Sequence, residues 1–257
     1  MAGEVVIRVE HLTAKYGERV IFDDVSFDVR RGEVFVILGG SGCGKSTMLK
    51  HMIGLYRPAA GHVFLDGEDV SAAEGEARRK ILRRIGVMYQ SGALFGSMTL
   101  LENVLLPLEE FTDLPADARD LVARTKLRLV QLDGFEDFFP AEISGGMKKR
   151  AAIARAMALD PHLLFLDEPS AGLDPITSAE LDSTILRLSR TLGVTFVVVT
   201  HELQSIFAIA ERVIMLDKRK RGIIASATPA ELRDHSPDPL VRSFFRREVP
   251  PREVPGS

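Results

Sequence analysis

A glycine-rich segment near the N-terminus carries residue types that bind phosphate. It reads Gly39, Gly40, Ser41, Gly42, Cys43, Gly44, Lys45, Ser46 and Thr47. This order fits the phosphate-loop pattern, in which a glycine and four free positions precede Gly-Lys-Ser/Thr. Glycines let the backbone curl so that successive N–H groups point inward and bind phosphate oxygens at the N-terminus of a helix. The segment therefore predicts a nucleotide-binding loop.

Two side chains of this loop and two later carboxylates could together transfer a phosphoryl group to water. We expect Lys45 to neutralise the β- and γ-phosphates and the Ser46 hydroxyl to bind Mg²⁺. Asp167 and Glu168 follow the apolar run 163–166, at the C-terminal end of a predicted strand, where α/β sheets bind ligands. Asp167 would help to hold Mg²⁺ through water, and Glu168 would polarise the attacking water. An apolar strand that ends in Asp-Glu is more often structural, but its pairing with the phosphate loop favours catalysis.

The elements around these residues predict an α/β fold. The apolar run 34–38 precedes the loop as a buried parallel strand, and 46–52 follows it as a helix. Alternating apolar residues over 5–9 and 25–29 predict half-exposed antiparallel strands. We expect further strands at 62–65, 85–90, 163–166 and 194–199, a charged helix at 72–84 and a hairpin over 213–224.

The middle of the chain has a different pattern. Thr99 and Glu102 form a capping box, and apolar residues at helical spacing follow over 101–108. A second helix is predicted over 116–132. Residues 91–160 therefore predict a helical subdomain inserted into an α/β core.

Composition narrows the class of protein. The 257 residues, 46% hydrophobic and 27% charged, match one large globular domain. A net charge of −3 argues against a nucleic-acid partner. The single cysteine, Cys43, excludes an internal disulfide framework and fits a reducing compartment. No apolar run approaches the ~18 residues of a membrane span, and the N-terminus lacks a secretory pattern. We therefore expect a cytoplasmic chain that a partner holds at any membrane where it acts.

A third segment, Ile143–Met147, introduces a family resemblance. Ser144, Gly145 and Gly146, upstream of Asp167, resemble the signature sequence of ATP-binding-cassette (ABC) ATPases. The remaining motifs stand in that family's order: Tyr16 as the adenine-stacking aromatic, Gln90 as the Q-loop glutamine, 171–174 as the D-loop and His201 as the switch histidine. The resemblance covers roughly residues 4–226, and the chain is identified as a member of this family.

This resemblance implies that the chain hydrolyses ATP with Mg²⁺ as cofactor. Gln90 would contact Mg²⁺ and the lytic water while facing a membrane partner, and His201 would contact the γ-phosphate. Each of Tyr16, Gln90 and His201 also has an ordinary structural interpretation, as a strand aromatic, a surface amide and a hydrogen-bonded histidine. Their joint order favours the catalytic one.

The signature segment also predicts a partner. Ser144 is expected to cap a helix whose first turn carries Lys148, Lys149 and Arg150. Positive charge there opposes the helix dipole, at about 0.3–1 kcal/mol per charge, and an anion at the N-terminus would relieve this cost. The resemblance implies that this anion is the γ-phosphate on the phosphate loop of a second copy. A head-to-tail homodimer would then close two nucleotides between its protomers.

The implied fold class is α/β: a P-loop NTPase core, with a parallel sheet and an antiparallel β subdomain, plus an inserted α-helical subdomain. We expect one ABC ATPase domain over 1–245, with a RecA-like core over 1–90 and 161–245 and the helical subdomain over 91–160. An extended C-terminal tail is predicted over 246–257. This tail either docks on the partner protomer or a regulatory subunit, or is disordered.

Smaller features indicate a subgroup of the family. Met147 replaces the usual glutamine of the signature, and together with the runs 90–95, 102–104 and 173–177 it resembles the ATPases of Mla and related Mce lipid transporters. This implies a permease, an MCE-domain lipid-binding subunit and sometimes a STAS-domain protein as partners, at the cytoplasmic face of the inner membrane. The alternatives are the ATPase of an amino-acid or other solute importer and, less favoured, a soluble ABC ATPase outside transport.

Two further features have competing interpretations. Cys43 is interpreted as a small space-filling residue, with a thiol pKa lowered by the helix N-terminus as the less favoured alternative. The basic run 218–221 is interpreted as a solvated hairpin turn, with contact to anionic lipid as the alternative.

Overall fold

The structure is a computed structural model, and it describes residues 3–248. Its strands are β1 (Val5–Tyr16), β2 (Arg19–Arg30), β3 (Val34–Gly39), β4 (Ala60–Leu65), β5 (Glu68–Asp69), β6 (Ile85–Met88), β7 (Leu163–Asp167), β8 (Thr195–Val199), β9 (Arg212–Asp217) and β10 (Gly222–Ala227). Its helices are α1 (Lys45–Met52), α2 (Gly75–Leu82), α3 (Leu100–Phe111), α4 (Ala116–Leu129), α5 (Gly145–Ala156), α6 (Pro175–Leu192), α7 (Leu203–Ile209), α8 (Pro229–His235) and α9 (Pro239–Arg246), with a 3₁₀ turn at Pro140–Glu142.

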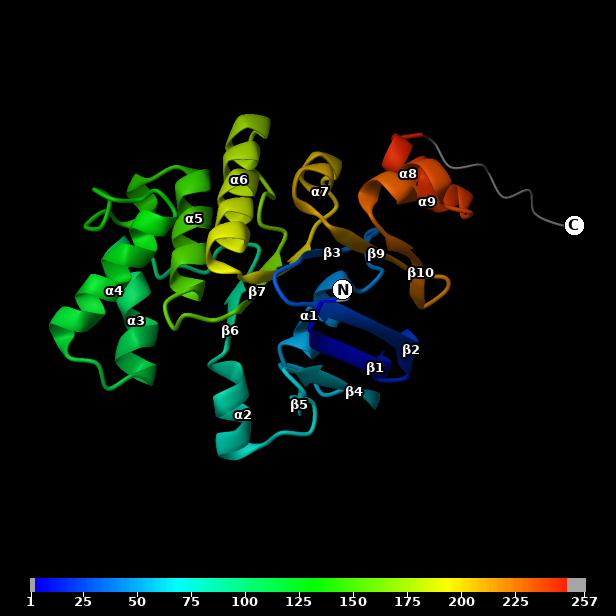
Figure 1. The fold of residues 1–257 in the computed structure, drawn as a ribbon, viewed down its shortest axis with the longest axis horizontal. Helices are drawn as coiled ribbons and strands as arrows, with labels where there is room; N and C mark the ends of the chain where they lie inside the picture. The colour runs from blue at the N-terminus through cyan, green and yellow to red at the C-terminus, as the bar shows by residue number, and fades with distance from the viewer. Residues whose placement is uncertain (1–2, 249–257) are drawn as a thin grey trace, which may run out of the picture.

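These strands form two sheets. The six-stranded sheet has the order β10-β9-β3-β8-β7-β6 and is parallel except for β10, whereas the sheet β2-β1-β4-β5 is antiparallel. Helices α3 to α9 lie on one side of the six-stranded sheet, and α1 and the antiparallel sheet lie on the other (Figure 1). The result is a three-layer α/β arrangement.

The parallel strands are apolar throughout because both of their faces are covered. Every residue of β3 is buried. Val34, Val36 and Leu38 pack on the helical side, whereas Phe35 and Ile37 pack against α1 and the antiparallel sheet. One continuous apolar run thus serves two separate cores, as its two-residue period requires.

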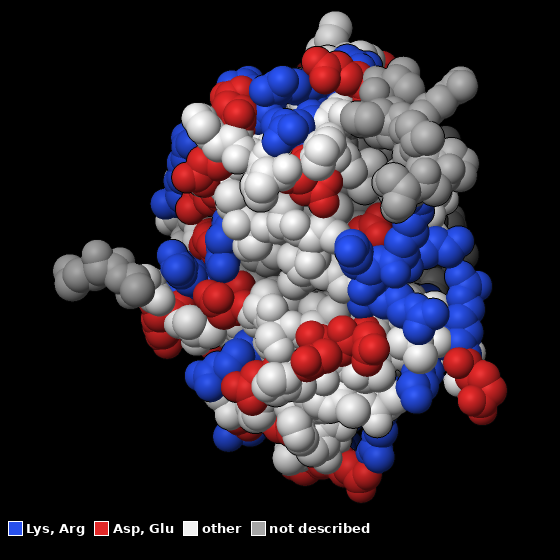
Figure 2. Space-filling model, turned by 90° about the vertical axis from the view of Figure 1, so that its right-hand side faces the viewer, with Lys and Arg blue, Asp and Glu red and all other residues white. Residues whose placement is uncertain are grey.

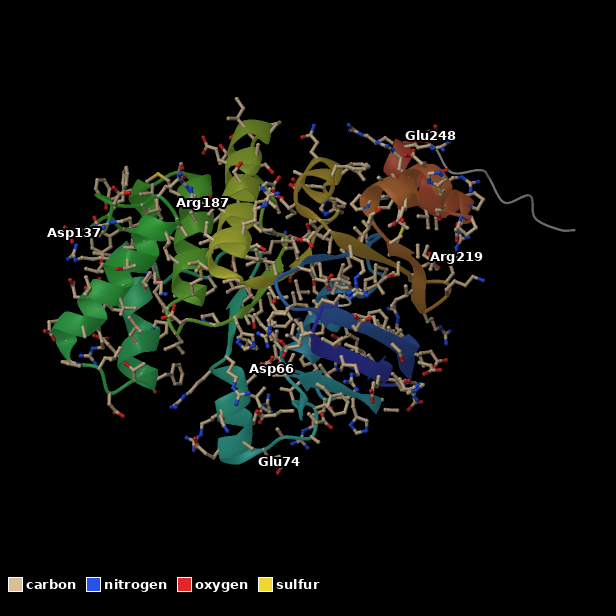
Figure 3. The ribbon with its side chains drawn as sticks, in the orientation of Figure 1. Asp66, Glu74, Asp137, Arg187, Arg219 and Glu248 are labelled. Atoms are coloured by element: carbon tan, nitrogen blue, oxygen red, sulfur yellow. The ribbon has the colours of Figure 1, made fainter. Side chains whose placement is uncertain are left out.

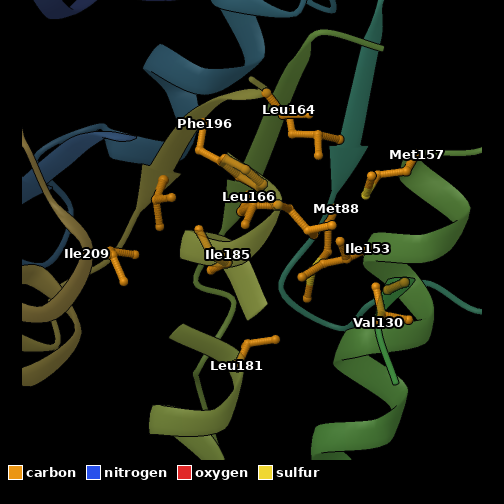
Figure 4. Packing of buried hydrophobic residues seen from close by; sticks show 14 of the residues in the cluster. Met88, Val130, Ile153, Met157, Leu164, Leu166, Leu181, Ile185, Phe196 and Ile209 are labelled. Carbon is orange, nitrogen blue, oxygen red and sulfur yellow. The ribbon is translucent and has the colours of Figure 1, made fainter. Parts of the chain in front are cut away.

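The helical side is a single packed core (Figure 4). Met88 of β6, Leu166 of β7 and Phe196 of β8 meet Ile153 of α5 there, each at 0% exposure. Arg187 of α6 reaches across this layer and donates to the Leu129 carbonyl at the end of α4, 2.8 Å away (Figure 3). These contacts fix the helical layer on the sheet.

The other layer is joined to the sheet by stacking and charge. The Phe27 ring of β2 stacks on the Phe35 ring of β3, with 5.6 Å between the ring centroids. Arg212 of β9 donates to a Glu33 carboxylate oxygen and to the Asp28 carbonyl, both at 2.7 Å. Arg212 is largely buried and pairs with the carboxylates of both Asp28 and Glu33, so removing Arg212 would leave these two negative charges without their cation. The antiparallel sheet is therefore held in one orientation.

Most predicted elements are present. The Thr99–Glu102 capping box is confirmed, and so is the hairpin, whose turn over 218–221 joins β9 to β10. The helix predicted over 72–84 is shorter, Gly75–Leu82, and the strand predicted over 85–90 ends at Met88. Helices α8 and α9 were not predicted. Helix α9 includes Arg246, the first residue of the predicted tail, and residues 249–257 lie outside the described part. Among residues 3–248, no helix is long and apolar enough to cross a bilayer.

Gly86 in β6 allows α5 to approach the sheet closely, which gives a test of the packing. A Cβ added there would lie 2.2 Å from the Ala156 carbonyl oxygen, a backbone atom that cannot move aside alone. We expect Gly86→Ala to lower the free energy of unfolding by about 1–3 kcal/mol, measured by urea denaturation. Gly96→Ala is the matched control, since a Cβ there meets nothing within 4 Å. Equal stability of the two variants would contradict this packing.

Candidate functional site

Strand register brings three chain segments to one edge of the parallel sheet. Ile37 of β3 pairs with Val199 of β8, and Val199 pairs with Asp167 of β7. All three strands are parallel, so the segments that follow them leave the sheet at the same edge. These segments are the predicted phosphate loop, the Asp167–Glu168 pair and the loop that carries His201.

The loop after β3 has the backbone that its glycines allow. Gly42 and Gly44 have φ of 70° and 103°, and a Cβ at Gly44 would lie 2.5 Å from the Phe22 ring. The Lys45 ammonium folds back over the loop and donates to the carbonyls of Gly39 at 2.9 Å and Gly40 at 3.4 Å. A cation and the N-terminus of α1 therefore face the same small volume, which suits a phosphate group.

Ser46 and Asp167 meet across the sheet edge. The Ser46 hydroxyl donates to Asp167 Oδ1 at 3.3 Å. Burial raises the pKa of Asp167, the bond from Ser46 opposes that shift, and the nearby Glu168 charge adds to it. A buried carboxylate beside a second carboxylate gains from a bound cation. This pair can therefore contribute to a divalent-cation site.

Glu168 and His201 form the second contact of the edge. His201 Nδ1 lies 2.9 and 3.0 Å from the two Glu168 carboxylate oxygens. Since a carboxylate only accepts, Nδ1 carries the proton of this bond. Glu168 has an unusual φ of 48°, with its N–H bound to the Val199 carbonyl at 2.8 Å. Its side chain is only 12% exposed, whereas that of His201 is 62% exposed. The carboxylate is thus fixed, and the imidazole is open to a ligand.

Tyr16 lies on the neighbouring layer, beside the start of α1. Its hydroxyl is 3.3 Å from Thr47 Oγ1, and its ring meets Tyr56 edge-on at 6.0 Å. Tyr16 is 48% exposed. An aromatic face is therefore available next to the phosphate loop, where a nucleobase could stack.

The predicted signature residues begin α5. Ser144 caps this helix by accepting from the Met147 N–H at 3.3 Å, as predicted. Ser144 and Gly145 are exposed, whereas Gly146 packs against Thr177 of α6 so closely that a Cβ would lie 2.2 Å from its methyl carbon. Helices α5 and α1 bury their apolar residues on opposite faces of the sheet. The signature residues are therefore not brought together with the chain's own phosphate loop.

Two sequence expectations need correction. Of the three charges expected at the start of α5, Lys149 is buried and donates to the Gln90 carbonyl, while Arg150 lies 3.5 Å from the Val130 carbonyl. The side chains of Lys149 and Arg150 therefore bond to neighbouring backbone carbonyls and are not simply solvated charges at the helix start. Burial raises the pKa of the Cys43 thiol, outweighing the Lys45 charge, and Cys43 is only 3% exposed. The lowered pKa is wrong, and Cys43 is a space-filling residue.

Sequence reasoning missed two groups that support the edge. The Gln90 side chain is exposed, but the Gln90 backbone carbonyl accepts a hydrogen bond from the Lys149 ammonium. Lys149 occupies a buried position of α5, on the same helix face as Gly146 and Ile153. The helical spacing of Lys149 within an apolar face is the sequence signal that could have predicted its burial. Asp182 of α6 accepts from Ser205 of α7 behind the His201 loop. It carried no recognisable motif.

A cavity of about 250 Å³ adjoins the phosphate loop. It is lined by Gly42 and Cys43, by Glu18 of the β1–β2 turn and Arg19 at the start of β2, and by Lys218 and Arg221 of the β9–β10 turn. Figure 2 views the molecule from the side where that turn lies and shows Lys and Arg side chains gathered on this face, among scattered acidic groups. The basic run is thus a hairpin turn whose cations border the phosphate loop.

A phosphate loop at the carboxyl edge of a parallel sheet, with a carboxylate pair and a histidine beside it, defines a P-loop ATPase. The model of the family described as ABC transporter matches residues 22–171. The chain belongs to the ABC transporter family, and it is an ATP-binding ATPase; the predicted family and fold class are confirmed.

Individual relatives agree with this assignment. The MlaF protein of Escherichia coli K12, named an intermembrane phospholipid transport system ATP-binding protein, is 41% identical over 89% of this chain and 84% of its own. The probable ribonucleotide transport ATP-binding protein mkl of Mycobacterium leprae is 41% identical over 94% of this chain and 69% of its own.

Solved structures are similar over most of the chain. A dimeric ATP-binding cassette bound to ADP and Pi in a post-hydrolysis state has a TM-score of 0.77 and 31% identity, over 86% of this chain and 98% of its own. The cbiO1 protein of Clostridium perfringens, part of the ABC transporter complex cbiONQ, has a TM-score of 0.83 and 26% identity. The match covers 95% of this chain and 96% of the cbiO1 chain.

Asp182 provides a pH test of the support behind His201. Burial raises its pKa from 3.8 to about 6. The folded state thus retains the Asp182 proton up to about pH 6, the unfolded state loses it near pH 4, and stability falls as pH rises through this window. We expect Asp182→Asn to raise the Tm above that of the parent chain at pH 7.5, with a gain that shrinks as pH falls towards 4. Thermal unfolding followed by circular dichroism between pH 4 and 7.5 measures this difference in Tm. A difference in Tm of constant size at every pH would contradict the account.

Proposed function

We propose that this chain is the ATPase subunit of an ABC transporter that moves phospholipid or a related lipid in the bacterial envelope. The observation that carries the ATPase part is the aligned edge of β3, β8 and β7, which gathers Lys45, Asp167 and His201. The lipid part is supported by the MlaF relatives and by Met147 with its neighbouring runs.

The chemistry follows from the order of groups along this edge. The loop amides and Lys45 would bind the β- and γ-phosphates, with Tyr16 against the base. Glu168 would accept a proton from the attacking water as it adds to the γ-phosphorus, and His201, released from Glu168, would donate to a γ-phosphate oxygen. Gln90, from the other side, would orient the same water. The products are ADP and inorganic phosphate.

Mg²⁺ fits the residues present. Ser46, Asp167 and Gln90 offer oxygen ligands, and the pKa of Asp167, raised by burial, means that a cation there would be favourable. Within the described residues no group of three or more His, Cys, Asp or Glu forms a metal cluster. This suits an ion that binds mainly through nucleotide phosphates and water. When bound, Mg²⁺ would neutralise charge that develops on the phosphates.

A second copy of the chain would complete each site. Ser144, Gly145 and Gly146 start a helix on the face of the sheet opposite α1. Ser144 and Gly145 are exposed, so the N-terminal end of that helix would bind an anion supplied from outside the chain. A head-to-tail homodimer would place the partner's γ-phosphate there, and the similar solved cassette is itself dimeric.

Replacing the proposed base should trap this dimer. We expect Glu168→Gln to lower the ATPase rate about a hundredfold or more, because the amide cannot accept the proton of water. With ATP and Mg²⁺ the variant should elute as a dimer by size exclusion with light scattering. The double variant Lys45→Ala/Glu168→Gln is the control and should remain a monomer. A Glu168→Gln chain that stays monomeric with bound ATP would contradict the nucleotide sandwich.

The proposed partners follow from the lipid assignment. They are an integral membrane permease, an MCE-domain lipid-binding subunit and, in some systems of this kind, a STAS-domain protein, with the ATPase peripheral on the cytoplasmic face of the inner membrane. The relative named MlaF in Haemophilus influenzae, 38% identical over 95% of this chain, supports the same assignment.

A second candidate is the ATPase of a solute importer. The name of the mycobacterial relative, which mentions ribonucleotide transport at 41% identity, favours it. The two candidates share the hydrolytic edge and differ only in what the permease carries. They are therefore separated by the partners and not by the site.

Recovery of the complex from its native membrane separates them. The chain would be captured in detergent through an affinity tag, with Glu168→Gln as a matched bait, and co-purifying proteins and lipids identified by mass spectrometry. We expect an MCE-domain subunit and phospholipid. A solute-binding protein without enriched phospholipid would overturn the lipid assignment and leave the ATPase assignment standing.

A further inference from the structure

Lys149 is a buried cation that touches the Q-loop. It is 8% exposed, and its ammonium donates to the backbone carbonyl of Gln90. Burial lowers its pKa, and the charges of Glu168 and Glu202 oppose that shift, which places both carboxylates near it. Lys149 therefore contacts the segment that carries one proposed catalytic group, Gln90, and its charge interacts with that of another, Glu168.

A second cation of the same helix holds the next residues. Arg155 donates to the Ala93 carbonyl at 2.7 Å and to the Gly92 carbonyl at 3.1 Å. Gly92, with φ of 73°, lies so close to α5 that a Cβ would be 3.4 Å from the Ala152 methyl group. Residues 90–93 are therefore attached to α5 along its length.

The far end of the loop is fixed separately. Asn103 of α3 is fully buried and bonds the backbone of Phe95, Met98 and Thr99 at 2.8–3.1 Å. Because α5 holds residues 90–93 and α3 holds residues 95–99, a displacement of α5 would act on the backbone at Gln90. The transmitting contact nearest to Gln90 is that of Lys149.

Helix α5 thus has two functional ends. Its first residues would bind the nucleotide on the partner's phosphate loop, while Lys149, one turn further, holds Gln90 of the chain's own site. We propose that Lys149 is a positioning residue that links the two nucleotide sites: capture of the partner's nucleotide at Ser144–Gly146 sets the position of Gln90. This inference rests on the proposed dimer.

The link gives the two sites positive cooperativity. If both nucleotides must be captured before either Gln90 is placed, hydrolysis rises steeply with ATP concentration. Replacing Lys149 with Met keeps the buried apolar stem and removes the donor. The freed Gln90 carbonyl is on an exposed segment and can bind water, so the fold loses little.

The experiment compares full-length chains carrying Lys149→Met, Lys149→Arg and Lys148→Met. Lys148 lies half-buried on the same turn of α5, so its replacement tests the loss of charge alone. We expect Lys149→Met to keep its Tm, to lower the Hill coefficient for ATP towards about 1 and to lower kcat about tenfold at saturating ATP. Lys149→Arg should restore the Hill coefficient, and Lys148→Met should leave both values unchanged.

Amide hydrogen exchange in the Glu168→Gln background measures the protection of each segment without ATP turnover. ATP and Mg²⁺ should protect residues 39–47 and 90–98 in the parent chain, but only 39–47 once Lys149→Met is added. Unchanged protection of 90–98, or a lowered Tm with an unchanged Hill coefficient, would overturn the link and reduce Lys149 to a structural role. Absence of protection at 39–47 would instead overturn the proposed function.

Discussion

The site depends on the register of three buried strands. Ile37, Val199 and Asp167 lie in one row across β3, β8 and β7. That row is fixed because alternate residues of each strand enter two different cores, so a slip by one residue would exchange the two sets of side chains. A sheet buried on both faces therefore determines where the loop, the carboxylates and the histidine emerge.

Two side-chain contacts at this edge each join two chain segments. Ser46 bonds Asp167, and His201 bonds Glu168, so the three loops are joined in pairs without a dense network. Lys45 is retained by loop carbonyls, which are weaker acceptors than phosphate oxygens. The arrangement leaves the cation, the imidazole and the α1 N-terminus free to exchange these contacts for those of a nucleotide.

Motifs that act through nearby residues were predictable from the sequence, and those that depend on packing were not. The glycines around Lys45 dictate local backbone shape, and the strand after Leu163 is apolar over its whole length, so both were placed correctly. The burial of Lys149 depends on which elements cover it, and the sequence pattern suggested an exposed charge instead. Cys43 was correctly favoured as a space-filling residue. Asp182 and Ser205 approach only because α6 and α7 pack together. The roles assigned to Glu168, His201 and Gln90 stay predictions that the geometry supports.

The central claim is that one nucleotide is held by two copies of the chain. A crystal structure of the Glu168→Gln variant with ATP and Mg²⁺ tests it most directly. The account predicts a γ-phosphate held by Lys45 of one protomer and by Ser144 and Gly146 of its partner. Bound ATP with the start of α5 facing solvent in every copy would contradict it.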